Sequence, residues 1–447
     1  MKPTYPDKLM KSLSRTLLPL LASIVAALGM PVLLTSCEDS VESGELTLTP
    51  LTLGLVWPDD MDTADSVIES VELTCRNISS GELSSFATLD EVKVLPGLYD
   101  IDLSVTLSDA GGTEVKLSGA QRSVTVGRTP EALSIPLFRA LLTDDLIIAE
   151  IFFTGTLHSS GNPYTGDDYI KLYNNTDHVV YADGLTLFET KFTTTEKRDY
   201  TPDIMAEAVT VQALYTIPGS GKEHPVQPGE YLLLADTGID HRVSNPNSLN
   251  LSHADFEWYD VSSTPSSLDI DSAVPNLDKW YCYTLSYWVL HNRGFKGYGI
   301  ARIPIGREEY LADYLYTYDY LMETAAGTFP MSASAYRMPN DWIVDMVNCS
   351  IESGFAWTLC APELDSGWTH CGSIDHDKTR YFKSVRRKLS HFSADGHPVF
   401  KDTNNSSADF NADAVPSEIE LQQSAIDRTG TPCHRKTYDG IIPVTEQ

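Results

Sequence analysis

Imidazole, thiol and carboxylate side chains gather in residues 369–377, which read THCGSIDHD. Such groups at close spacing are the usual ligands of zinc and copper sites in proteins. Three of them, His370, Asp375 and His376, are therefore candidate metal ligands. We favour a polar surface loop instead, because Cys371 would lose its thiolate on forming a disulfide.

Residues 402–413 read DTNNSSADFNAD and place oxygen ligands at alternate positions, beginning with Asp402 and Asn404. A calcium loop of the EF-hand type has a glycine at its sixth position and an acid at its twelfth. Ser407 occupies the sixth position here and Asp413 the twelfth. We favour a capped loop and keep calcium as the weaker alternative. No other cofactor is predicted.

The sequence carries no pattern of a common catalytic mechanism. It contains neither G-x-S-x-G nor H-E-x-x-H, which mark a serine nucleophile and a zinc protease, and no nicotinamide or flavin fingerprint. PGSGKE at 218–223 lacks the spacing of a phosphate-binding loop and predicts a turn. Paired carboxylates of the glycosidase type stay open, because 62 acidic residues always offer pairs. We assign no catalytic residue.

Aromatic side chains are concentrated between residues 280 and 320. Tyrosines at alternate positions would share one face of a strand. We favour a packed Tyr-rich insertion. The alternative is a recognition surface, because amphipathic rings suit contacts with proteins or glycans. Its residues would be Trp258, Tyr259, Trp280, Tyr281, Tyr314, Tyr316, Tyr318 and Tyr320.

The N-terminus has the pattern of an export signal. Residues 1–15 carry four basic side chains and one acid, and residues 17–34 carry no charge. A basic start followed by an apolar run predicts a secretory signal peptide, here residues 1–36. A transmembrane anchor is the alternative, which Pro19 and Pro31 disfavour.

The end of the apolar run, LTSC at 34–37, resembles the bacterial lipobox. The resemblance implies that Cys37 becomes the new N-terminus and carries a diacylglyceryl thioether. Glu38 and Asp39 resemble the signal that sends Bacteroidetes lipoproteins to the outer face of the outer membrane. Residues 37–45 would then be a lipidated tether. A periplasm-facing anchor is the alternative.

The mature chain is strongly acidic. Removal of residues 1–36 takes away four basic side chains and one acid, which leaves 28 Lys and Arg, 61 Asp and Glu, and a formal charge of −33. Such a field repels nucleic acid and anionic lipid, so we predict no nucleic-acid partner.

Six cysteines follow Cys37, and in an oxidising compartment they allow up to three disulfides. They are Cys75, Cys282, Cys349, Cys360, Cys371 and Cys433. DTA at 62–64 and DSV at 65–67 match the Bacteroidetes O-glycosylation pattern, which names Thr63 and Ser66 as candidate acceptors.

The elements that position these residues are predicted to be strands, so the fold class is all-β. Over residues 46–142, short alternating runs such as GLYDIDLSVTLS are separated by turns, which predicts a small β-sandwich that is similar to transthyretin-like domains. A second sandwich is predicted over 143–420. It exceeds a bare sandwich at about 190–210, 237–285 and 305–340, and residues 421–447 form a C-terminal extension.

The second region resembles the lamin-tail domain, an Ig-like β-sandwich. The phrases that carry this likeness are LIIAEIFFTG (146–155), DDYIKLYNNT (167–176), VQPGEYLLLA (226–235) and DWIVDMVNC (341–349). The likeness implies two packed sheets with long insertions between their strands.

Phrases along nearly the whole mature chain, among them PGSGKEHPVQPGEYLLLA and KDTNNSSADF, resemble DUF4876, a family of Bacteroidetes outer-membrane lipoproteins of uncharacterised function. Such lipoproteins are often encoded beside TonB-dependent β-barrel receptors. The resemblance therefore implies a non-catalytic binding or accessory role in nutrient capture. The alternatives are an adhesin or envelope-structural protein, and a hydrolase that uses acidic residues of the insertions.

Overall fold

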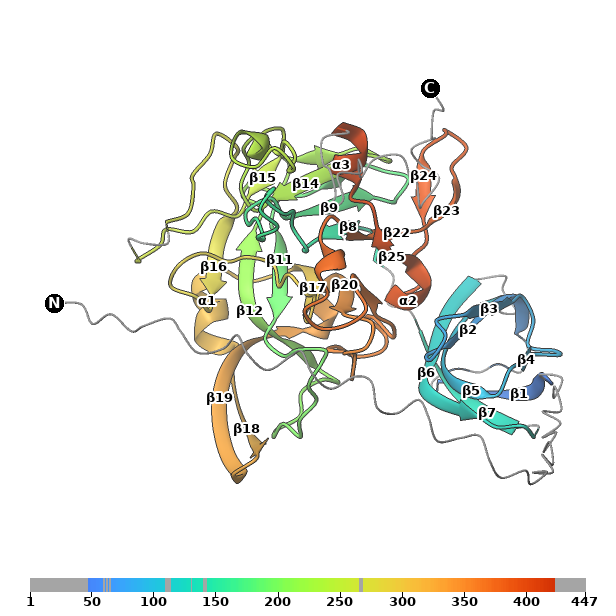
Figure 1. Ribbon diagram of the computed structural model, residues 1–447. Coiled ribbons are helices and arrows are strands. Elements are labelled where there is room, and N and C mark those ends of the chain that lie inside the picture. Colours follow the sequence, from blue (N-terminus) through green and yellow to red (C-terminus); the bar gives the residue numbers. More distant parts are fainter. Residues whose placement is uncertain are drawn as a thin grey trace, which may run out of the picture. The chain divides into compact units, whose positions relative to one another are not determined.

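The computed structural model describes residues 47–58, 61, 63, 66–108, 114–129, 131–139, 143–264 and 268–422 (Figure 1). These residues form many strands and few, short helices, so the predicted all-β class is confirmed. Within this part of the chain, no helix combines the length and the apolar character that a membrane crossing requires. The predicted signal peptide and tether, with Cys37, Glu38 and Asp39, lie outside the described residues.

The N-terminal strands form one seven-stranded sheet in the order β3-β2-β5-β6-β7-β1-β4. They are β1 (Thr49–Val56), β2 (Val67–Asn77), β3 (Leu83–Phe86), β4 (Lys93–Val94), β5 (Gly97–Ser108), β6 (Glu114–Val126) and β7 (Glu131–Arg139). The first six residues of β7 pair in parallel with β1, and its last three pair antiparallel with β6. Strand β7 therefore connects β6 to β1 within the sheet. The sheet has a hydrophobic core of its own, which the alternating residues Ile101, Leu103 and Val105 of β5 help to fill.

An eight-stranded sheet is the first layer of the larger body. Its order is β18-β19-β12-β11-β17-β20-β21, with β16 paired to β12. The strands are β11 (Leu185–Thr190), β12 (Ala208–Thr216), β16 (Asp278–Cys282), β17 (Gly297–Arg302), β18 (Leu315–Thr324), β19 (Gly327–Pro339), β20 (Ile343–Ser350) and β21 (Thr369–His370). Segment 305–340 thus extends this sheet, because β19 pairs with β12.

A six-stranded sheet, ordered β15-β14-β9-β8-β22-β25, is the second layer. Its strands are β8 (Leu146–Phe152), β9 (Tyr169–Asn174), β14 (Tyr231–Ala235), β15 (Phe256–Glu257), β22 (Ser384–Arg387) and β25 (Phe410–Ala414). Two small ladders pair β10 (Val180–Tyr181) with β13 (Pro225–Val226) and β23 (Leu389–Phe392) with β24 (Pro398–Phe400).

Short helices connect the strands. They are α1 (Arg307–Asp313), α2 (Ser406–Asp409), α3 (Ser417–Gln422) and the 3₁₀ turns η1 (His241–Val243), η2 (Asn340–Trp342) and η3 (Lys378–Arg380).

Apolar side chains from both layers form the main core. Leu146, Ile148 and Ile151 of β8 pack there with Leu185 and Leu187 of β11. All seven residues of β8 are buried, as expected of a strand that is covered on both faces. The lamin-tail likeness itself stays a prediction.

The expected disulfides are not found among the described cysteines. Five of the six candidates lie in the described residues, and all five are free. Burial raises the pKa of the Cys75 thiol to about 12 and also raises the pKa of Cys360, so both act as small apolar groups. Cys433 lies outside the described residues.

Candidate functional site

A helix and a hairpin carry the Tyr-rich segment. Helix α1 has Glu308 and Glu309 in its first turn, where acids suit the positive end of the helix dipole. Strands β18 and β19 then pair antiparallel over ten positions, from Leu315 to Thr324 on the first strand. We call this β18–β19 hairpin the arm.

Tyrosines alternate along the first strand of the arm. Tyr316 and Tyr318 are buried and Tyr320 is half-buried on one face, while Leu315 and Asp319 are exposed on the other. The alternation expected of a strand is confirmed for these three tyrosines, because successive side chains of a strand point to opposite faces.

Segment 191–205 covers the tyrosine face of the arm. Phe192 and Tyr200 stack with ring centroids 3.8 Å apart, and they meet Tyr318 edge-on at 5.1 and 5.4 Å. The Tyr316 hydroxyl donates a 2.5 Å hydrogen bond to the Pro202 carbonyl. Tyr316 and Tyr318 are therefore packed side chains of an insertion and do not lie on an exposed recognition surface.

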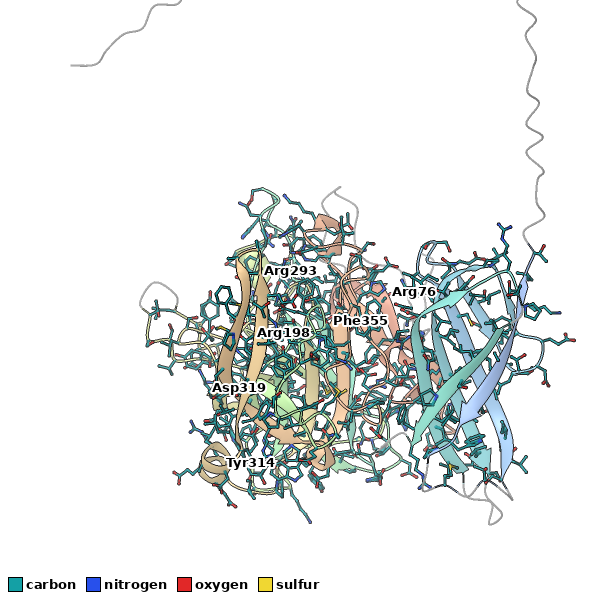
Figure 2. The ribbon with its side chains drawn as sticks, turned by 90° about the horizontal axis from the view of Figure 1, so that it is seen from below. Arg76, Arg198, Arg293, Tyr314, Asp319 and Phe355 are labelled. Carbon is teal, nitrogen blue, oxygen red and sulfur yellow. The ribbon has the colours of Figure 1, made fainter. Side chains whose placement is uncertain are left out.

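The covering segment is also fixed by its backbone and by a cation. The N–H groups of Thr201 and Asp319 each donate to the other residue's carbonyl at 2.9 Å. The Arg198 guanidinium lies 4.9 Å from the centroid of the Tyr320 ring, a cation–π contact. Figure 2 labels Arg198 and Asp319 in this region. Burial raises the pKa of Tyr200 to about 12, so its hydroxyl stays neutral at physiological pH.

The arm leaves apolar groups exposed at its outer face and tip. Leu321 is 61 % exposed and Phe329 is 44 % exposed, although both are large hydrophobic residues. The Arg198–Tyr320 pair lies at the edge of the covered face. We call Leu321 and Phe329 the arm tip; Phe329 pairs with Met322 and so lies on the face of Tyr320, whereas Leu321 lies on the opposite face. They offer one exposed apolar side chain on each face of the arm, and Arg198 is already paired with Glu196.

The other predicted recognition residues are divided between two places. Trp258 is fully buried in the main core, 5.0 Å from Trp288, and is therefore not part of an exposed surface. Tyr259 is half-buried. Trp280 and Tyr281 are half-buried against the aromatic side chains of α1 and β19.

Tyr314 lies at the end of α1 and outside β18 (Figure 2). Its ring stacks on Tyr310 at 5.2 Å and packs against Trp342 at 4.9 Å. The eight predicted recognition residues therefore do not form one face.

The predicted metal ligands are not brought together. His370 is buried in β21, whereas Asp375 and His376 are exposed, and Asp375 pairs with Arg293 at 2.6 Å. Asp402 accepts a 3.0 Å hydrogen bond from Arg387.

Asn404 donates a hydrogen bond to the Glu363 carbonyl. Residues 402–409 instead form a loop capped by Asn405, whose side chain accepts from the N–H groups of Ser407 and Ala408 at the start of α2.

A different trio of ligand types does meet in space. One ligand atom from each of Asp183, Glu223 and His224 lies within 4.8 Å of the others. However, the Asp183 carboxylate already accepts from the N–H groups of Gly221, Glu223 and His224 at 2.9–3.0 Å. Burial raises the pKa of Asp183, and these hydrogen bonds more than offset it, so that its pKa is lowered. We interpret Asp183 as the anchor of the 218–224 loop. The separation of 40 residues hid this contact from sequence reasoning.

The remaining predicted sites concern modification. Thr63 and Ser66 are half-buried, and the Ser66 N–H donates to the Thr63 carbonyl at 3.2 Å. Their O-glycosylation stays a prediction, as does lipidation of Cys37.

Comparison with known proteins gives a family for part of the chain. Residues 227–417 match the family described as "Protein of unknown function (DUF4876)". The matched region includes the arm. The covering segment and the N-terminal sheet both precede its first residue, Gln227. The expected resemblance to this family is thus confirmed, while its description says nothing about a membrane, a lipid or a receptor.

One solved structure is similar to the chain. It is the crystal structure of a DUF4876 family protein from Bacteroides thetaiotaomicron VPI-5482, with 20 % sequence identity and a TM-score of 0.49. The similarity covers 82 % of this chain and 96 % of that one. No curated protein matches the chain.

Proposed function

We propose that this chain, whose residues 227–417 match the DUF4876 family, is a surface-exposed, lipid-anchored protein of the outer membrane. It binds a partner and catalyses no reaction. The partner is a TonB-dependent β-barrel receptor, and the shared task is nutrient capture. The observation that carries the proposal is the LTSC stretch at 34–37, followed at once by Glu38 and Asp39.

The lipid gives the mechanism a physical basis. Two or three acyl chains on Cys37 hold a protein stably on a membrane, whereas one chain gives only marginal binding. An anchored protein moves in the plane of the membrane, so its effective concentration at a receptor in the same membrane is raised in the manner of linked sites. A modest contact area is then sufficient for a lasting complex.

The contact area that we assign to the partner is the arm tip. Leu321 and Phe329 are exposed on a hairpin whose base is fixed by the packed tyrosines. A rigid apolar projection loses little conformational entropy on binding. The Arg198 guanidinium beside Tyr320 adds no free charge to this area, because it already pairs with Glu196.

The test is a pull-down from detergent-solubilised outer membranes with a C-terminally tagged full chain. We expect a β-barrel receptor in about equal amount. The double variant Leu321→Ser, Phe329→Ser should stay anchored and recover about tenfold less barrel, which corresponds to roughly 1.4 kcal/mol. The control Val243→Ser, Leu285→Ser alters two apolar residues elsewhere that are even more exposed, at 87 % and 79 %, and should recover the wild-type amount.

Two outcomes contradict the proposal. If the wild-type chain recovers no β-barrel protein, it has no receptor partner. If the chain is instead retained on matrix or host proteins, the adhesin alternative is favoured. Equal recovery by the arm-tip variant and the control removes the arm tip from the interface.

A further inference from the structure

Three neighbouring strand ends meet at one edge of the six-stranded sheet. Strand β9 pairs antiparallel with both β8 and β14, and Figure 1 shows the three side by side. Gly155 follows β8, Asp167 and Asp168 precede β9, and Asp236 follows β14. The Asp236 N–H donates to the Asp168 carbonyl at 2.9 Å, which holds these ends together.

The three aspartates at this edge are buried. Their exposed fractions are 0 % for Asp167, 6 % for Asp168 and 3 % for Asp236. Asp167 Oδ2 accepts from the hydroxyls of Thr156 and Ser248 at 2.5 and 2.6 Å. Its Oδ1, Asp168 Oδ1 and Asp236 Oδ2 are all buried, and no donor among the described residues reaches them within hydrogen-bond geometry. A buried carboxylate oxygen without a partner is costly, so these oxygens need an explanation.

Some of these oxygens converge on a single point. A Cβ atom placed on Gly155 would lie 3.0 Å from the Tyr164 carbonyl oxygen, 3.2 Å from Asp167 Oδ1 and 3.5 Å from Asp168 Oδ1. Gly155 has a φ of +63°, so a side chain at this position would be strained and would also crowd the three oxygens. Two carboxylates and one carbonyl thus face the same small region from separate positions in the chain.

The described basic side chains do not neutralise this cluster. Lys279 pairs with Asp260 at 2.6 Å, and no described ion pair joins a basic group to the three aspartates. His241 lies beside them, with Nε2 2.9 Å from the Thr237 carbonyl and Nδ1 3.0 Å from the Tyr164 hydroxyl. A carbonyl only accepts, so Nε2 donates, and burial lowers the pKa of His241, which favours the neutral ring.

Electrostatics agrees with this geometry. Burial raises the pKa of Asp168, and the charges of Asp167 and Asp236 raise it further. The pKa of Asp236 is likewise raised, first by burial and then by Asp269. A bound cation would remove this cost, because opposite charge favours the ionised carboxylate.

We propose that this edge is a calcium-binding site in which Asp167, Asp168 and the Tyr164 carbonyl supply protein ligands. Asp236 adds negative charge beside them, and water completes the coordination shell. A set of carboxylate and carbonyl oxygens suits hard cations and not zinc or copper. Calcium is favoured over magnesium because it accepts irregular oxygen cages, whereas magnesium demands a near-ideal octahedron. The site differs from the 402–413 loop, whose Asp402 is occupied by Arg387.

The test uses the purified full chain after removal of calcium with a chelator. Added Ca²⁺ should raise the melting temperature by roughly 3 °C or more at saturation, with half the effect at about 10⁻⁴–10⁻³ M, as in extracellular calcium modules. Tb³⁺, a luminescent calcium substitute, should show tyrosine-sensitised emission that Ca²⁺ displaces.

Variants separate this site from general binding to an acidic surface. Asp168→Asn should abolish both the melting shift and the sensitised Tb³⁺ emission, while Asp177→Asn, at a fully exposed acid, should keep both. If Asp168→Asn does not fold, Asp236→Asn should weaken Ca²⁺ binding instead.

Three results would overturn the proposal. They are no Ca²⁺-dependent change in the wild-type chain, an undiminished response in the folded variant, and an equal response to Mg²⁺ at the same concentration. Each of these results tests calcium binding alone and does not depend on whether the chain binds a receptor.

Discussion

The Arg387 guanidinium donates a 2.6 Å hydrogen bond to the Asp345 carboxylate, and this contact joins β22 of one sheet to β20 of the other. Arg387 is 2 % exposed and also contacts Asp402 at 3.0 Å and Asp409 at 3.7 Å. One cation therefore serves three carboxylates between the two layers of the large sandwich. Burial raises the pKa of Asp345 and of Asp409 even though Arg387 opposes the rise.

Loss of this cation should be severely destabilising. Arg387→Met keeps much of the apolar stem but leaves buried carboxylates without their cation, so the free energy of unfolding should fall by about 3–5 kcal/mol. Denaturant unfolding followed by circular dichroism measures this change. Arg242→Met removes a partly exposed pair with Asp240 and should cost less than about 1 kcal/mol. Equal losses in both variants would contradict the assigned role of Arg387.

A buried histidine should make the fold sensitive to mild acid. The His291 Nδ1 accepts from the Phe295 N–H, so the ring is neutral in the folded chain. Burial, with the charges of Lys296 and Arg293, lowers the pKa of His291 to about 4. The unfolded chain binds this proton near pH 6.5, so stability is full above that pH and is lost as the pH falls towards 4.

The variant His291→Asn tests this expectation, because its amide oxygen can replace Nδ1 as the acceptor. Between pH 7 and pH 4 it should lose roughly 2 kcal/mol less stability than the wild-type chain, in unfolding curves at each pH. His376→Asn, at an exposed histidine, should keep the wild-type profile. Parallel profiles for all three proteins would rule out His291 as a source of acid sensitivity.

The described cysteines should contribute no disulfide to stability. Burial raises the pKa of the thiols of Cys349 and Cys371 well above the usual range, so they should react slowly. Alkylation of the native protein followed by peptide mapping should leave both unmodified, and alkylation in denaturant without reductant should modify them fully. A disulfide-linked peptide containing either residue would be inconsistent with this structure.

The covering segment should depend on the tyrosine face of the arm. Tyr318→Ala removes the ring against which Phe192 and Tyr200 pack, so segment 191–205 should open more often. Trypsin should then cleave after Lys197 or Arg198 at least roughly tenfold faster than in the wild-type chain. Tyr283→Ala, at a tyrosine that is 53 % exposed, should leave the rate unchanged. An unchanged rate in Tyr318→Ala would mean that other contacts hold the segment.

Local patterns predicted the strands well. The alternation in GLYDIDLSVTLS matches β5, whose residues Tyr99, Ile101 and Leu103 face the core. The alternating tyrosines also form a strand face as expected. These features depend on neighbours in sequence, which a period of two reveals.

Contacts between distant residues were not predictable in the same way. Nothing near Tyr318 indicates that Phe192 and Tyr200, more than 100 positions earlier, cover it. The adjacent acids Asp167 and Asp168 look like a polar strand start, and only the pairing of β9 with β14 brings Asp236 beside them. Tertiary pairing therefore decides which side chains become a site.

The most direct test of the central claim is the intact mass of the chain purified from the outer membrane of its own cells. We predict a chain that starts at Cys37 and carries a diacylglyceryl group, with or without an N-acyl chain. The variant Cys37→Ser should be found in the soluble fraction instead. A mature protein that begins at another residue, or one that begins at Cys37 without added lipid mass, would contradict the proposal.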